Sequence, residues 1–155
     1  MSVVGKLSAL TIGIGLIASV GIYSVNASTI SLSGQAPKKG SVTLDDNDHV
    51  VSASSPIIYG LAKEAEKEAS NPIFGESKTA VNYAHSRWVY YSDRHGLHHY
   101  KVGHSNFYHR TEYHTSYAKV GGNGRRSKQA GPNKWSYAAV AGHGTFRAYY
   151  NAPYL

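Results

Sequence analysis

The sequence predicts an all-β protein, with a small antiparallel β-sandwich at the C-terminal end of the chain. Three observations support this class. Eleven of the thirteen tyrosines follow position 80, where Val, Thr and Trp are also frequent, and these residue types favour strands. Glycine and asparagine interrupt the same region at short intervals, as turns between short strands require. No part of this region shows the sustained period of an amphipathic helix.

Five runs in this region are the strongest strand candidates, at 87–92, 99–102, 112–120, 135–141 and 145–150. Turn residues separate them, at 93–96, 121–124, 131–133 and 142–144. Five or six short strands joined in this way favour a small sandwich or barrel. The apolar alternation is imperfect and assigns no faces, but Trp88 and Trp135 are the predicted core anchors because buried tryptophan dominates small cores.

The first 27 residues have the pattern of an export signal. Lys6 precedes an apolar run at 7–25, and Val25-Asn26-Ala27 provides a signal peptidase site. We therefore expect residues 1–27 to be a signal peptide and the protein to be secreted and extracellular. The alternative is an uncleaved membrane anchor, since the run approaches the roughly 20 residues that span a bilayer.

Residues 28–80 differ in composition from the residues that follow. They contain five Lys against seven Asp or Glu and few large apolar side chains, which predicts a largely flexible polar segment or a pro-region. One short, solvated helix is expected at 60–70, where strong helix formers are concentrated. Residues 81–155 contain ten Lys or Arg against two carboxylates and form the predicted folded domain.

The basic charge of residues 81–155 favours an anionic partner at a cell surface. The candidate ligand-binding cations are Arg110, Lys119, Arg125, Arg126 and Lys128, and Lys134 is a further available cation. The pair Arg125-Arg126 is the best candidate, because backbone N–H groups of the glycine-rich turn at 121–124 can bind the same anion. The alternative is that each charge only provides solubility at a turn or a strand edge.

Composition and spacing also argue against several classes of site. The chain has no cysteine, so disulfides and thiolate metal sites are absent, and a core this small leaves homodimerisation open. Eight of the nine histidines follow position 80, and a zinc site would draw on them. The histidines considered are His95, His98, His99, His104, His109 and His114. Strand neighbours point to opposite faces, so we expect no metal and no cofactor.

Enzymatic activity, membrane insertion and nucleic-acid binding are not expected either. Asp93 and Glu112 are the only carboxylates after position 80, and neither belongs to a catalytic motif. Beyond the export segment no apolar run is long enough to cross a bilayer, so membrane contact is expected only at the surface. A basic aromatic surface suits nucleic acid chemically, but export removes the protein from it.

An ordered series of residue types extends over 88–155. Its members are Trp88, Ser105, Asn106, Phe107, Tyr108, His109, His114, Ser116, Arg126, Ala130, Gly131, Trp135, Tyr149, Tyr150 and Asn151. In this order they resemble the lactococcin 972 family of secreted bacteriocins. The resemblance implies a small all-β sandwich without modified residues, which inhibits growth and septum construction by binding the cell-wall precursor lipid II. Residues 28–80 and 132–134 depart from the compact members of that family.

A lipid II head group presents a pyrophosphate, amino sugars and a short peptide. Binding it requires cations and hydrogen-bond donors for the phosphates and aromatic faces for the sugars, and residues 81–155 supply both. A second class of function needs the same surface, namely a non-toxic extracellular carbohydrate- or surface-binding module on a flexible stalk. An uncleaved anchor at 7–25 would favour this second class.

Overall fold

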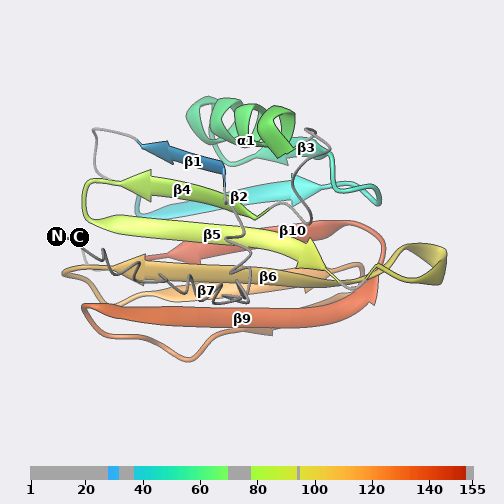
Figure 1. Ribbon diagram of the computed structural model, residues 1–155. Helices are drawn as coiled ribbons and strands as arrows, with labels where there is room; N and C mark the ends of the chain where they lie inside the picture. Colours follow the sequence, from blue (N-terminus) through green and yellow to red (C-terminus); the bar gives the residue numbers. More distant parts are fainter. Residues whose placement is uncertain (1–27, 32–36, 70–77, 94, 153–155) are drawn as a thin grey trace, which may run out of the picture.

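The computed structural model describes residues 28–31, 37–69, 78–93 and 95–152. These residues form two β-sheets packed face to face, with one helix, α1 (Pro56–Ala69), along one side of the sandwich (Figure 1). The predicted all-β sandwich is therefore confirmed. The described strand pairs are antiparallel except for β1 with β4, which run parallel.

Each sheet has five strands. Sheet A contains, in spatial order, β1 (Ser28–Ser31), β4 (Thr79–Tyr83), β5 (Ser86–Asp93), β6 (Tyr100–His109) and β9 (Lys134–His143). Sheet B contains β3 (Val50–Ala53), β2 (Lys39–Leu44), β10 (Phe146–Asn151), β7 (Thr115–Val120) and β8 (Asn123–Arg126). A short 3-10 helix, η1 (Leu97–His99), precedes β6. Each predicted strand overlaps β5, β6, β7, β9 or β10, and the other five strands were not predicted.

Aromatic rings from both sheets fill the core. Tyr150 of sheet B stacks on Phe107 of sheet A with ring centroids 4.3 Å apart, and its ring centroid is 4.9 Å from that of Trp88. Gly103 lies opposite Phe146, where a Cβ would come within 2.4 Å of the ring. A side chain at position 103 would therefore keep the two sheets apart, which explains the glycine.

The prediction of a flexible segment at 28–80 is wrong for its described residues. β2 runs between β3 and β10 inside sheet B, and its Val42 is fully buried. The boundary at residue 81 is also wrong, because Val81 lies in the middle of β4. The prediction was wrong because it relied on composition. The few apolar residues of β2 alternate with polar ones, so each points into a core that is formed largely by the C-terminal strands.

Helix α1 begins before the predicted start at residue 60. Ser55 Oγ accepts a hydrogen bond from the backbone N–H of Ile58 at 3.2 Å, and Pro56 occupies the first position, where proline is favoured. The helix is not simply solvated, since Ile58, Leu61 and Ala65 are buried. It contacts β1 and β4 of sheet A and β2 and β3 of sheet B. It therefore closes the side of the sandwich where the edge strands β1 and β3 lie (Figure 1).

The predicted signal peptide at 1–27 lies outside the described residues. Among the helices that the structure describes, none is both long and apolar enough to cross a membrane.

The two tryptophans have different environments. Trp88 is 0% exposed and is confirmed as a core anchor. The same prediction for Trp135 is wrong, because this residue is half-buried on the outer face of sheet A. Successive strand residues alternate between faces, and in β9 it is Ser136 and Ala138 that point into the core. Trp135 therefore packs outside, beside Tyr108.

Candidate functional site

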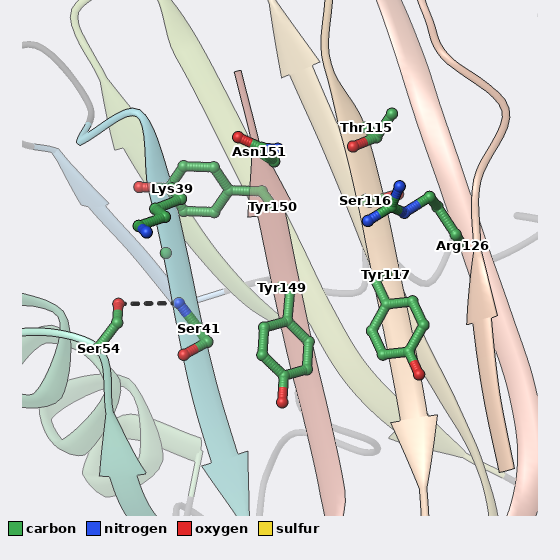
Figure 2. A pocket seen from close by; sticks show the side chains of 11 residues that line it. Lys39, Ser41, Ser54, Thr115, Ser116, Tyr117, Arg126, Tyr149, Tyr150 and Asn151 are labelled. Carbon is green, nitrogen blue, oxygen red and sulfur yellow. Dashed lines mark hydrogen bonds between the residues drawn. The ribbon is translucent and has the colours of Figure 1, made fainter. Parts of the chain in front are cut away.

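The outer face of sheet B carries a row of polar and aromatic side chains. Strand register aligns Ser41 of β2, Tyr149 of β10, Tyr117 of β7 and Arg126 of β8. The ring centroids of Tyr117 and Tyr149 are 5.4 Å apart, and Figure 2 shows the two rings side by side. Because neighbouring strands lie about 4.8 Å apart, the row is about 14 Å long. It can contact several connected groups of one ligand.

Further cations lie on both sides of this row. On one side Lys39 is paired with Asn151, and on the other Arg147 is paired with Lys119. Lys39 and Arg147 are exposed and Lys119 is half-buried. We refer to the set Lys39, Tyr117, Lys119, Arg126, Arg147 and Tyr149 as the cationic face.

A shallow pocket of about 450 Å³ opens over these strands. Its polar lining includes Lys39, Ser41, Thr115 and Arg126, and the rings of the two tyrosines form an apolar part (Figure 2). Ser54 Oγ accepts the backbone N–H of Ser41 at 2.9 Å, which holds one wall in place. The pocket thus combines cations, hydroxyl donors and aromatic surface.

Among the described residues, the strands that carry the cationic face add no carboxylate to it. The described strands of sheet B contain no Asp or Glu. Within the described part of the chain, no salt bridge involves any of the four cations. Guanidinium and ammonium groups that are not already paired can bind phosphate oxygens through charge-assisted hydrogen bonds. The face therefore suits an anionic ligand.

The predicted pair Arg125-Arg126 does not form one anion site. Arg126 is paired with Tyr117 and faces outward, whereas Arg125 is paired with the buried Ala118. Consecutive residues of a strand point to opposite faces, so Arg125 leaves β8 on the other side. Only Arg126 of the pair belongs to the cationic face, together with the predicted Lys119.

The other predicted cations lie elsewhere. Arg110 and Lys128 are exposed in the loops that follow β6 and β8. Lys134 begins β9 in sheet A, where it is paired with His109. The structure brings none of these three residues onto the cationic face.

Most residues of the ordered series over 88–155 lie in the core. The core group consists of Trp88, Ser105, Phe107, His109, His114, Ser116, Ala130 and Tyr150. Asn106 and Tyr108 face outward on sheet A, as Trp135 does. Tyr149 and Arg126 face outward on sheet B, next to Asn151. Gly131 lies in a loop, against Tyr113. The series therefore describes a packing pattern more than a ligand site.

Two buried histidines stabilise the loop between β6 and β7. The backbone N–H groups of Thr111 and Glu112 donate to His109 Nδ1 at 3.2 and 3.0 Å. Burial lowers the pKa of His109, and the charge of nearby His114 would lower it further. His114 is held by Ala130, with backbone hydrogen bonds of 2.9 Å in both directions. A neutral His109 is therefore part of the folded state.

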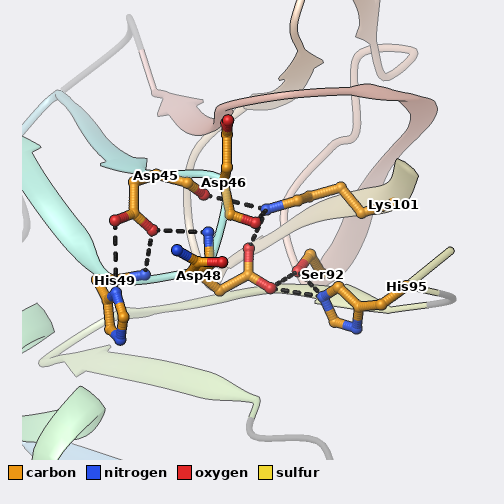
Figure 3. Close-up of polar contacts among 8 residues, drawn as sticks. Asp45, Asp46, Asp48, His49, Ser92, His95 and Lys101 are labelled. Carbon is orange, nitrogen blue, oxygen red and sulfur yellow. Dashed lines mark hydrogen bonds and ion pairs between the residues drawn. The ribbon is translucent and has the colours of Figure 1, made fainter. Parts of the chain in front are cut away.

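A second polar cluster joins the two sheets at one end of the sandwich (Figure 3). The side chain of Lys101, in β6, is fully buried, and its Nζ contacts Asp48 Oδ1 at 2.6 Å. The same Nζ donates to the backbone carbonyls of Asp45 and Asp46, both at 3.0 Å. These three residues belong to the turn between β2 and β3, so Lys101 attaches that turn of sheet B to sheet A.

The same cluster contains a serine, a histidine and an aspartate, but not in a catalytic arrangement. His95 Nε2 lies 2.6 Å from Asp48 Oδ2 and 3.1 Å from Ser92 Oγ. A catalytic triad uses both ring nitrogens, one for the carboxylate and one for the serine. Here one nitrogen contacts both groups, so the cluster holds the turn in place and does not activate Ser92.

No group of metal-binding side chains is present among the described residues. His98 and His99 lie in η1 with positive φ angles, and both are exposed. The strand geometry assumed for them in the sequence is therefore wrong, because β6 begins only at Tyr100.

Sequence reasoning missed Lys39, Arg147, Tyr117 and the buried Lys101. The signal for the first three was present, since 39–44, 115–120 and 146–151 each place polar or aromatic residues at every second position. A period of two would have assigned each of these residues to the outward side of its own strand. Lys101 had no such signal, because an isolated lysine in a strand is expected outside.

The chain matches no family model, no curated protein and no solved structure in the three comparisons.

Proposed function

We propose that this sandwich is a non-enzymatic anion-binding protein that acts outside the cell, with the cationic face as its binding surface. More specifically, we propose a secreted antibacterial protein of the lactococcin 972 type. It binds lipid II on related Gram-positive cells and thereby blocks cell-wall and septum synthesis.

One observation carries the proposal: four cations that form no salt bridge within the described part of the chain surround two tyrosine rings, on strands that contain no carboxylate. A pyrophosphate carries closely spaced negative charges, and Arg126 can bind one phosphate through two parallel hydrogen bonds. Lys119 and Arg147 add charge on the adjacent row. The tyrosine rings offer a flat surface for the attached sugar.

The ordered series over 88–155 gives independent support. Its buried members, such as Trp88, Ser105 and Tyr150, hold β5, β6 and β10 against one another. Because core residues carry the resemblance, it supports a fold shared with the family. The proposed ligand is supported by the cationic face instead.

The test compares two variants of a chain containing residues 28–155, which includes every described element. Arg126→Ala removes a cation from the cationic face, and Arg125→Ala removes the neighbouring cation, which points away. Both variants lose the same charge. We expect Arg126→Ala to weaken binding to lipid II in nanodiscs about tenfold, which corresponds to about 1.4 kcal/mol, and Arg125→Ala to bind like the parent.

Growth inhibition of related Gram-positive cells is the second measurement. The parent protein should inhibit growth, and added lipid II should protect the cells. Equal binding by the two variants would contradict the assignment of the face. Lipid II binding without any growth inhibition would instead favour the non-toxic surface-binding module.

A further inference from the structure

The outer face of sheet A carries a strip of exposed aromatic rings that the cationic face does not include. Tyr108 of β6 is paired with Trp135 of β9, with ring centroids 5.6 Å apart. Tyr137 follows Trp135 on the same side of β9, at 6.2 Å and with an interplanar angle of 25°. We refer to Tyr108, Trp135 and Tyr137 as the aromatic strip.

The strip is accessible although its rings are large. Tyr137 is 65% exposed, and Tyr108 and Trp135 are half-buried. Leaving such rings in water forgoes the stabilisation that burial of their apolar surface would give. Exposed aromatic side chains that are grouped on one face mark a binding surface more often than isolated ones do.

The side chains outside the strip that are paired with it are polar, and one of them is charged. Asn106 is paired with Tyr137, and the hydroxyl group of Tyr108 donates to Asn133 Oδ1 at 3.1 Å. Arg87 is the cation on the adjacent strand, paired with Tyr108. The strip therefore combines flat apolar surfaces with amide and hydroxyl groups at their edges.

We propose that the aromatic strip is a second binding site, and that its ligand is the glycan of the cell wall, a chain of pyranose sugars. Each pyranose has an apolar face of C–H groups, which packs on an aromatic ring, and equatorial hydroxyl or amide groups, which hydrogen-bond at its rim. Trp135 and Tyr137 are two positions apart on one strand with nearly parallel planes. They offer two successive surfaces to a chain of repeating rings.

The composition of the strip favours a glycan over a membrane or a protein partner. Trp and Tyr also occur in protein interfaces and at membrane surfaces, but the described residues paired with the strip, Arg87 and Asn106, are polar and add no Leu, Ile, Met or Phe to it. Each of its rings instead carries a polar group at its edge. The aliphatic side chains beside it are Val89 and Ala139, which are paired with Asn106 and His104.

This site is separate from the cationic face, and it rests on the proposed function only in that the protein acts outside the cell. Sheets A and B form opposite layers of the sandwich, so their outer faces point in opposite directions (Figure 1). One face can bind a charged precursor while the other binds neutral polymer.

The test uses tryptophan fluorescence, because the two tryptophans differ in exposure. Trp88 is 0% exposed, so quenching by neutral acrylamide reports on Trp135. The probe is the soluble hexamer of N-acetylglucosamine, added to the chain containing residues 28–155. We expect the hexamer to protect Trp135 from acrylamide. Tyr137→Ala should weaken hexamer binding about tenfold.

The matched control is Tyr113→Ala, which removes a tyrosine that is 54% exposed in the loop after β6. It should bind the hexamer like the parent. Purified sacculi stripped of anionic polymers test the polymer itself, and the parent should sediment with them while Tyr137→Ala should not.

Three results would overturn the proposal. The first is a folded parent protein that neither binds the hexamer nor sediments with sacculi. The second is a dimer in analytical ultracentrifugation that Tyr137→Ala abolishes, since the strip would then be a contact between copies. The third is a blue shift of Trp135 on neutral phosphatidylcholine vesicles without any effect of the hexamer, which would assign the strip to membrane contact. Failure of the proposed function would show differently, as equal lipid II binding by the Arg125 and Arg126 variants.

Discussion

Trp88 Nε1 donates a hydrogen bond of 3.0 Å to Ser105 Oγ. The serine in turn donates at 2.8 Å to the backbone carbonyl of Tyr149. Trp88 and Ser105 belong to sheet A and Tyr149 to sheet B. This buried chain of hydrogen bonds therefore joins the two layers directly beneath one tyrosine of the cationic face.

Ser105→Ala should destabilise the protein by about 2–3 kcal/mol, because it leaves the buried indole N–H of Trp88 without an acceptor. Ser136→Ala is the matched control. Ser136 is also buried, but its hydroxyl makes one hydrogen bond, to the backbone carbonyl of Phe107 at 3.0 Å. Urea unfolding followed by fluorescence should give a clearly larger loss for Ser105→Ala. If both variants lose the same free energy of unfolding, the two linked hydrogen bonds of Ser105 stabilise the protein no more than one ordinary hydrogen bond.

Lys101→Met should lower the free energy of unfolding by about 2–3 kcal/mol. The substitution keeps the buried volume but removes the donor shared by Asp48 and two backbone carbonyls. This loss of stability is smaller than the loss expected on breaking a fully buried ion pair, because the Asp48 side chain is 25% exposed. Lys128→Met, at an exposed loop position, should leave the urea midpoint unchanged. A Lys101 variant with the parent's midpoint would show that this attachment of the turn is dispensable.

A chain limited to residues 81–155 should not fold. It would lack β2, leaving β10 with an unpaired edge, and would lack the buried Val42 and Ile58. Lys101 would also lose its partners and remain in the core as an unpaired charge. Circular dichroism and amide proton dispersion should show an unfolded chain, in contrast to residues 28–155. A cooperative unfolding transition of the short chain would mean that the N-terminal strands are only an addition to a complete domain.

Acidification should destabilise the protein in part through His109. Burial lowers the pKa of His109 below its ordinary value of 6.5, and His114 and His85 act in the same direction while Glu112 opposes them. The unfolded chain therefore takes up a proton below about pH 6.5 that the folded protein does not, so stability falls as the pH falls. The contribution of one such group is at most about 1.4 kcal/mol per pH unit.

The pH prediction is checked with His109→Asn, whose amide oxygen can replace Nδ1 as an acceptor but does not titrate. Its stability loss between pH 7.5 and pH 5.5 should be smaller than that of the parent. His98→Asn is the control, because His98 is exposed and has a φ of 56°, which asparagine tolerates. If the free energy of unfolding falls equally with pH in the parent and in the His109 variant, His109 does not cause the acid destabilisation.

Gly124→Ala should weaken lipid II binding without any change of charge. A Cβ at Gly124 would lie 1.9 Å from the hydroxyl oxygen of Tyr117, so that the ring must leave its place on the cationic face. We expect a loss of about threefold to tenfold in affinity, measured by titration into lipid II nanodiscs. Gly122→Ala, in the turn before β8, meets nothing within 4 Å and should bind like the parent. Equal affinities would show that the position of Tyr117 does not matter for the ligand.

The sequence predicted the fold class because tyrosine, valine and glycine are distributed as short strands and turns require. It failed where the signal depends on partners distant in the chain. Nothing near Val42 indicates that its strand lies between β3 and β10. The sequence also does not show on which face of a sheet a residue lies. Trp135 is as large and apolar as Trp88, and only the register of β9 decides that it lies outside.

The candidate site was predictable in charge but not in geometry. Lys119 and Arg126 were identified from the basic composition of 81–155. Their relation to Arg147 and Lys39 depends on the pairing of four strands, which composition does not contain. Arg125 was included because it is adjacent in sequence, although adjacency in a strand separates two side chains.

Sheet B is built around β10, the last strand that the structure describes. β10 pairs with β2 on one side and with β7 on the other, so the sheet has a gap at its centre until residues 146–151 arrive. Contacts this distant along the chain close slowly, because a long loop must be ordered before they form. Sheet B can therefore be completed only after residues 146–151 have been synthesised, so the sandwich cannot fold before these residues leave the ribosome.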